Sequence, residues 1–167
     1  MSLFSKPIKT LDDLFVHTLQ DIYYAENQIV KHLPKMIAKS ETPELKSALE
    51  SHLHETEGHV RRLEQVFSMH GQPVKGVTCP AMDGITAEAA EIMGDCDDKA
   101  VRDAAIISAA QAVEHYEMTR YGTLISLAKQ LGRDDCAAVL KETLDEEKAA
   151  DAKLSQIAGS KVNRLAA

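Results

Sequence analysis

The sequence predicts an all-α protein built from four long helices and one short one, and three observations predict it. Over four long segments, apolar residues recur at alternating steps of three and four, which is the spacing of one buried helix face. Glycine, proline and capping residues separate these segments. No stretch alternates apolar and polar residues convincingly, and β-branched residues are sparse, so no strand is expected.

The first helix is expected at about residues 10–39. Thr10 and Asp13 have the spacing of a capping box, which satisfies two backbone donors at a helix start. Pro34 falls inside this helix and predicts a kink, because its ring removes one backbone hydrogen bond.

The second helix is expected at about 43–70. Pro43 suits its first turn, where a missing N–H costs nothing, and Gly71 ends it. A short helix is expected at about 86–94, rich in alanine and glutamate, while Cys79 and Pro80 are assigned to the loop before it.

The last two long helices are expected at about 98–131 and 134–158. Asp97 or Asp98 can cap the earlier of them, and Asp134 can cap the later one.

Loop lengths then predict the topology. The first two helices are joined by only a few residues, and so are the last two, around Gly132. A much longer connection, from Gly71 to Lys99, carries the short helix. Two tight antiparallel hairpins and one long crossover describe a ferritin-like four-helix bundle, here as a single domain over 1–167. An ordinary up-down bundle with a decorated middle loop is the alternative.

Composition restricts the class of protein. At 167 residues with 44% apolar content, the chain is suited to one domain with a sizeable core, and it contains no apolar run long enough to span a membrane. The net charge of −7 disfavours nucleic acid as a partner. Residues 1–10 lack an apolar export signal, and the cysteines are odd in number and widely spaced, so we expect reduced thiols in the cytoplasm.

Charged residues interrupt the apolar faces of the four long helices. Carboxylates and imidazoles that face a core cost several kcal/mol each unless a partner neutralises them, and a metal cation is the natural shared partner. The candidate metal ligands are Glu26, Glu55, His59, Glu114, Glu117, Glu147 and Asp151.

Height along the bundle supports one common site. In each expected hairpin the acids lie at nearly equal distances from the turn: 14 and 15 residues for Glu26 and Glu55, and 15 each for Glu117 and Glu147. They therefore gather within about one helical turn, roughly 5.4 Å of rise. Carboxylates suit iron(II) or manganese and can bridge two ions. We expect two iron ions, with manganese or another divalent metal as the alternative.

The ligand pattern departs from the usual one. Bundles of this type carry Glu-x-x-His pairs on two helices. A glycine and an alanine stand three residues after Glu55 and Glu147, so the ligands would be His59 and Asp151, one residue further on. This departure favours a structural ion, or protons and salt bridges without an ion, as the alternative.

Three further side chains lie near the expected site. Glu146 competes with Glu147 but lies about 100° away from the apolar face. His52 is expected to support a ligand or to lie on an exposed flank, and Tyr121 to donate a hydrogen bond to a ligand or simply to fill the core.

Several motifs resemble the YciE/YciF group of bacterial ferritin-like proteins. They are YAENQ at 24–28, HETEGH at 54–59, CPAMDG at 79–84, AVEHYEMTRYGTL at 112–124 and EEKAAD at 146–151. Glu114, Tyr121 and Glu147 also match the spacing of the related rubrerythrin-type proteins. The resemblance implies a four-helix bundle, a homodimer, a two-metal centre and production under stress.

Two functions follow as hypotheses. The first is a dinuclear iron protein that reacts with dioxygen or peroxide. The second is a non-catalytic stress protein that docks on itself or on a partner, with a structural metal or none. A hollow iron-storage shell is disfavoured by the short tails and the acidic balance.

Overall fold

The structure, a computed structural model, describes residues 7–167 and confirms a ferritin-like helical bundle. No strand forms among these residues. Residues 1–6, the start of the segment expected to lack an export signal, lie outside the described part. The elements are α1 (Leu11–Lys39), α2 (Pro43–Met69), α3 (Pro80–Asp95), α4 (Lys99–Gln130), α5 (Asp134–Ile157), the π-helix η1 (Ala158–Val162) and α6 (Asn163–Ala166).

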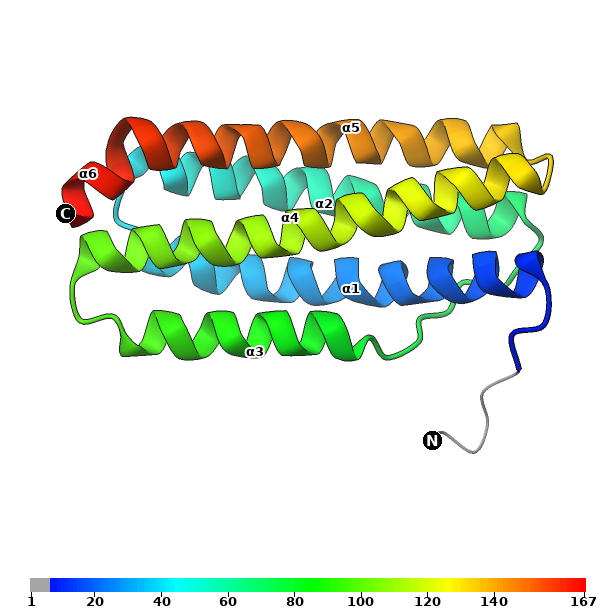
Figure 1. Ribbon diagram of the computed structural model, residues 1–167, viewed down its shortest axis with the longest axis horizontal. Coiled ribbons are helices and arrows are strands. Elements are labelled where there is room, and N and C mark those ends of the chain that lie inside the picture. The colour runs from blue at the N-terminus through cyan, green and yellow to red at the C-terminus, as the bar shows by residue number, and fades with distance from the viewer. Residues whose placement is uncertain (1–6) are drawn as a thin grey trace.

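The four long helices form two hairpins that pack on each other (Figure 1). Helices α1 and α2 form one hairpin, and α4 and α5 form the other. The hairpins meet through α1 against α4 and through α2 against α5, so every long helix borders the same interior. None of the described helices is both long and apolar enough to cross a membrane.

The helix starts follow the local chemistry that the sequence predicts. The Asp13 N–H donates to Thr10 Oγ1 over 3.0 Å and the Thr10 N–H donates to Asp13 Oδ2 over 3.1 Å, which completes the capping box. Pro43 is the first residue of α2. Asp98 caps α4 by accepting from two backbone N–H groups. Helix α1 continues through Pro34 to Lys39.

The crossover helix is longer than the sequence prediction of 86–94. Helix α3 begins at Pro80, because Cys79 caps it: its sulfur accepts from the Met82 N–H over 3.4 Å. Pro80 then stands in the first turn, where proline is tolerated. Assigning Cys79 and Pro80 to a loop placed the start of this helix six residues too late.

The chain end also differs from expectation. Asp134 is the first residue of α5 rather than its cap; Arg133 precedes it and binds the carboxylate of Asp135 at 2.8 Å. Beyond the expected end near residue 158 the chain stays helical through η1 and α6.

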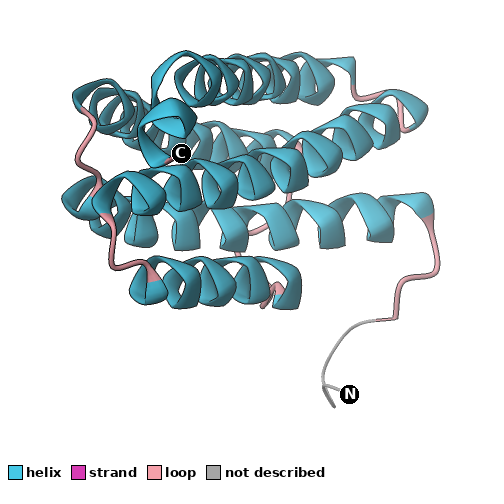
Figure 2. Ribbon diagram, turned by 60° about the vertical axis from the view of Figure 1, so that its left-hand side comes forward, coloured by secondary structure: helices cyan, strands magenta, loops and turns pink. Residues whose placement is uncertain are grey.

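The crossover is fixed against α1 and α4, and both ribbon views place α3 along the outside of that pair (Figures 1 and 2). The Tyr24 hydroxyl donates to Asp83 Oδ1 over 2.8 Å. The Tyr116 hydroxyl donates to Asp21, and its oxygen lies 2.9 Å from the Cys79 sulfur. These polar contacts hold α3 over the side of the bundle that α1 and α4 form.

One buried acid joins the two hairpins. Asp103 on α4 is 1% exposed, and its carboxylate accepts from the Glu41 N–H at 2.9 Å and from the Thr42 N–H at 2.7 Å. It therefore satisfies two backbone N–H groups of the turn between α1 and α2. It also fixes the position of that hairpin along the axis of α4.

Candidate metal centre

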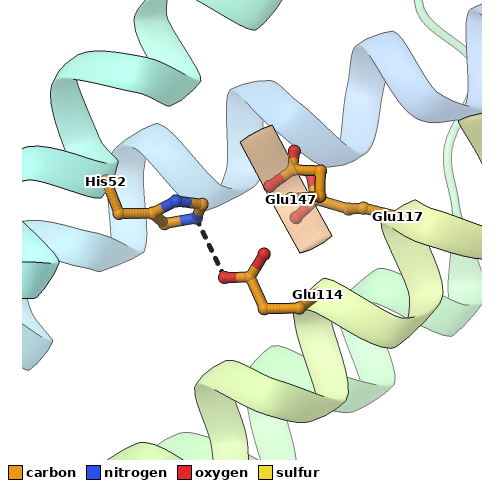
Figure 3. A group of neighbouring side chains, drawn as sticks. All are labelled: His52, Glu114, Glu117 and Glu147. Carbon is orange, nitrogen blue, oxygen red and sulfur yellow. Dashed lines mark ion pairs between the residues drawn. The ribbon is translucent and has the colours of Figure 1, made fainter. Parts of the chain in front are cut away.

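Six ionisable side chains from all four long helices meet in the middle of the bundle. All are at most 7% exposed. They are Glu26 on α1, His52 and His59 on α2, Glu114 and Glu117 on α4, and Glu147 on α5. We call them the buried cluster; Figure 3 shows four of them converging from α2, α4 and α5.

The buried cluster divides into two ligand groups that share one residue. Within each group, one potential ligand atom per residue lies within 4.8 Å of the others. The groups are His52, Glu114, Glu117 and Glu147, and Glu26, His59 and Glu147. Glu147 thus lies between two places where a cation fits.

Histidine nitrogens and glutamate oxygens of the cluster lie close together, but their geometry is not that of hydrogen bonds. His52 Nε2 lies 3.1 Å from Glu114 Oε1, and His59 Nδ1 lies 2.9 Å from Glu147 Oε1. Nevertheless these two histidine nitrogens lack a hydrogen-bond partner among residues 7–167, and so do both oxygens of Glu147. Both oxygens of Glu117 are in the same state.

Unsatisfied buried polar atoms are rare because each costs about 1–3 kcal/mol, and more when charged. In the buried cluster several unsatisfied atoms occur together, and histidine nitrogens lie close to glutamate oxygens. Ligand atoms that converge on a shared cation have this geometry, so the residues present fit a bound metal.

Neighbouring residues orient several cluster members. The Tyr121 hydroxyl donates to Glu26. The second ring nitrogen of His59, Nε2, lies 2.8 Å from Glu146 Oε2, and Arg62 donates to both oxygens of that carboxylate at 2.7 Å. Glu146 is therefore not a member of the cluster; it holds the His59 ring so that Nδ1 faces inward. The Arg62 guanidinium also holds the pKa of Glu146 below its usual range.

Without a cation, the cluster retains protons. Burial, reinforced by the charge of Glu147, raises the pKa of Glu114 to about 11. Burial and the neighbouring carboxylates likewise hold the pKa of Glu117 well above its usual range. Burial disfavours a charged His59, but Glu147 and Glu26 outweigh that cost and raise its pKa to about 11. A cation that enters must displace such protons.

Five of the seven sequence-predicted ligands are brought together: Glu26, His59, Glu114, Glu117 and Glu147. The other two lie outside both groups. The Glu55 side chain is 42% exposed. Asp151 is 22% exposed and accepts from the Gln111 side chain at 2.9 Å.

Sequence reasoning gave His52 a supporting or flanking place beside the site and left it out of the ligand set. The buried face of α2 contains Leu49, His52, Thr56, His59 and Leu63 in unbroken steps of three and four. Thr56, which is fully buried and donates to the His52 carbonyl at 2.8 Å, occupies the step between the two histidines. Thr56 fills the gap in the periodic pattern between His52 and His59, and it shows that Glu55 lies one position away from the interior.

Fold and site together define a ferritin-like helical bundle with a buried cluster of glutamates and histidines that can hold metal. Residues 10–167 match the family described as a domain of unknown function, DUF892, and the chain belongs to that family. The resemblance to the YciE/YciF group is confirmed: over 160 residues the chain is 44% identical to protein YciF of Escherichia coli K12, covering 95% of this chain and 96% of that protein.

Solved structures agree with this membership. One is YcfI of Rhodopseudomonas palustris, described as a proposed structural protein, at TM-score 0.89, 54% identity and 92% coverage of this chain and 98% of that one. Another is the E. coli stress protein YciF, at TM-score 0.89, 44% identity and coverage of 93% and 99%. A protein from Xanthomonas campestris pv. campestris, at 19% identity and TM-score 0.73 with coverage of 93% and 96%, shares the fold alone.

Proposed function

We propose that this protein is a dinuclear metal protein of the bacterial stress response, which binds two iron ions in the buried cluster and reacts with dioxygen or peroxide. Manganese or another divalent ion is the alternative metal. The observation that carries the proposal is the membership of Glu147 in both ligand groups, because a carboxylate between two sites can bridge two ions.

Charge and composition support two divalent ions. Four carboxylates contribute four negative charges when ionised, which two divalent ions neutralise. Four glutamates and two histidines are also the ligands of the ferritin-like di-iron bundles. The difference lies in their distribution, since both histidines here come from α2.

The chain's own residues position and shield such a centre. Glu147 stands between the two groups, Tyr121 orients Glu26, and the Glu146–Arg62 pair orients His59. Burial of all six cluster residues limits their contact with bulk water. The chemistry that iron supplies when bound is electron exchange with dioxygen or peroxide.

A small pocket suits dioxygen, the smaller and less polar of the two oxidants. It has a volume of about 80 Å³, lies between α1, α3 and α4, and reaches His52 and Glu114. Its lining is mostly apolar and includes Ile29, Leu33, Met36, Ala89, Met93 and Val113. An apolar recess of this size admits a diatomic molecule while excluding larger polar ones.

We further propose a homodimer in the cytoplasm. The resemblance to bacterial ferritin-like stress proteins supports the dimer, and three unpaired thiols suit a reducing compartment. Light scattering that gives twice the chain mass of 18.3 kDa supports the dimer; a monomer or a large shell contradicts it.

The decisive experiment measures metal content and then reactivity. Protein from iron-supplemented medium is desalted and its metal-to-chain ratio is determined; we expect two ions per chain, located by anomalous scattering at the buried cluster. Iron(II)-loaded protein is then mixed with peroxide or aerated buffer, and oxidation is followed optically. Protein that holds no metal and oxidises no iron(II) contradicts the proposal.

A second candidate is a non-catalytic structural protein with a structural ion or none. The description of the R. palustris relative as a proposed structural protein favours it, as does the absence of Glu-x-x-His pairs from the sequence. It predicts that bound metal is inert to peroxide, and that chelation changes stability without affecting any oxidation rate.

A further inference from the structure

A groove between α2 and α5 leads from the surface to the buried cluster. Its volume is about 730 Å³, far more than dioxygen or peroxide requires. Small side chains keep it open, among them Ser47, Ala48, Ala149 and Ala150. At its inner end lie His52 and Glu114, two members of the buried cluster.

Four acids and one lysine line the groove, and one acid is available to a cation. Glu44 is paired with Lys161 at 2.7 Å, Glu146 with Arg62 at 2.7 Å, and Glu114 is buried. The carboxylate of Glu55 makes no hydrogen bond within residues 7–167, and its ion-pair contact is with His52.

His52 stands between this accessible carboxylate and a buried one. Its Nδ1 lies 3.9 Å from Glu55 Oε2. Its Nε2 lies 3.1 Å from Glu114 Oε1, the ion pair that Figure 3 marks with a dashed line. The His52 side chain is only 9% exposed, and both ring nitrogens lack an aligned hydrogen-bond partner in the described chain. The ring therefore has one nitrogen on the side of Glu55 and the other on the side of the cluster, and both nitrogens are buried.

We propose that Glu55 and Nδ1 of His52 form an uptake site, where a divalent cation from solvent binds before it passes to Glu114 and the buried centre. The inference rests on the proposed metal centre. A hydrated cation loses its water reluctantly, so a half-exposed carboxylate lets it exchange part of its hydration shell before burial. The Glu55 carboxylate also attracts the cation electrostatically and thereby raises the association rate.

The test uses uptake of cobalt(II) by the full-length, metal-free protein, followed by stopped-flow absorbance. Glu55→Gln is compared with Glu57→Gln, which removes the same charge from α2 two residues away, outside the groove, where the side chain is 48% exposed. We expect Glu55→Gln to slow uptake about tenfold while the final cobalt-to-chain ratio stays at the wild-type value, and Glu57→Gln to match wild type.

A second variant tests the route without a change of charge. Ala149 is exposed and lines the groove, so Ala149→Phe narrows the opening without overpacking the core. We expect slower uptake with unchanged final loading.

Equal uptake rates in Glu55→Gln and Glu57→Gln would overturn the uptake site. Loss of a bound ion at equilibrium in Glu55→Gln would also overturn it, because Glu55 would then be a ligand of the centre itself. Failure of the metal centre is distinguishable, since wild-type protein would then take up no cobalt(II) at all.

Discussion

Glu147 is the side chain on which both ligand groups depend. It is fully buried, it belongs to both groups, and its two oxygens have no hydrogen-bond partner in the described part of the chain. Removing its negative charge therefore weakens both cation positions at once, whereas removing Glu26 weakens one.

We expect Glu147→Gln to bind less than one ion per chain under conditions that load two on wild type, and Glu26→Gln to keep about one. Asp145→Asn is the control, because Asp145 is 54% exposed on the same helix and pairs with Lys141. Elemental analysis after desalting measures the ratio. Full loading of Glu147→Gln would show that the carboxylate is not a bridging ligand.

The buried acids also predict a pH dependence of the metal-free protein. The pKa of Glu114 is about 11 in the folded chain and about 4.3 in an unfolded one, so between these values the folded state holds the extra proton. The free energy of unfolding therefore falls as pH rises above about 4.3. The raised pKa of His59 acts in the same direction above about 6.5.

We expect the metal-free wild type to lose stability between about pH 5 and about pH 8, and Glu114→Gln to lose less, because glutamine does not ionise. Urea denaturation with chelator present at both pH values measures the difference. Identical pH slopes in the two proteins would mean that Glu114 does not retain its proton on folding.

Residue periodicity predicted which of the candidate ligands converge in the interior, with exceptions on α2 and α5. Five of the proposed ligands lie in the cluster because steps of three and four select one helix face. Glu55 was misplaced because a buried threonine, Thr56, resembles a surface residue in sequence. His52 was given a supporting or flanking place rather than a place among the ligands, although it belongs to the same periodic pattern on α2.

At the scale of elements, the two hairpin turns set the height of the ligands. Gly132 has φ +69°, a backbone conformation that L side chains rarely adopt, and it ends α4 fifteen residues beyond Glu117.

A second glycine of α4 has no such constraint. Gly122 lies inside the helix, and an added Cβ there would meet open space.

The two glycines should therefore respond oppositely to alanine. We expect Gly132→Ala to destabilise the fold by about 1–2 kcal/mol, because of the positive φ. We expect Gly122→Ala to stabilise it by about 0.5–1 kcal/mol, because alanine favours a helix. Urea denaturation measures the free energy of unfolding of both variants. A change of the same sign in both would refute the backbone argument.

Asp103 links the α1–α2 turn to α4 through two charge-assisted hydrogen bonds. We expect Asp103→Ala to lower the free energy of unfolding by about 2–4 kcal/mol, since two backbone donors lose their acceptor in a buried place. Asp103→Asn keeps one acceptor oxygen and should lose less. Equilibrium denaturation of both metal-free variants makes the comparison, and equal losses would show that the hydrogen bonds are not the cause.

Helix existence was predictable and one helix start was not. Capping at Thr10 and Asp98 follows side-chain chemistry that the sequence displays directly. The start of α3 was missed because cysteine is not among the common capping residues, although Pro80 carried the signal for a first turn.

At the scale of the whole molecule, the bundle is closed on one side and open on another. Helix α3 covers α1 and α4 and leaves a small apolar pocket beneath it, while the α2–α5 side has the larger groove, which Glu55 lines. Both recesses reach His52 and Glu114. Under the proposed function, dioxygen and a hydrated cation would thus approach the cluster from different sides.

The same cluster links metal binding to the stability of the entire fold. All four long helices contribute residues to the buried cluster, so its geometry exists only when both hairpins are assembled, and a cation in the proposed centre would bind the folded state in preference to the unfolded one. We expect each site, at a free metal concentration of 100 times its dissociation constant, to stabilise the fold by about 2.7 kcal/mol, or roughly 5–10 °C in Tm. Calorimetry of wild type with iron(II) or with chelator measures the shift.

Glu147→Gln should show little shift in Tm, and Asp145→Asn should show the full shift. An equal Tm of the wild type in chelator and in metal would show that the buried cluster does not bind metal.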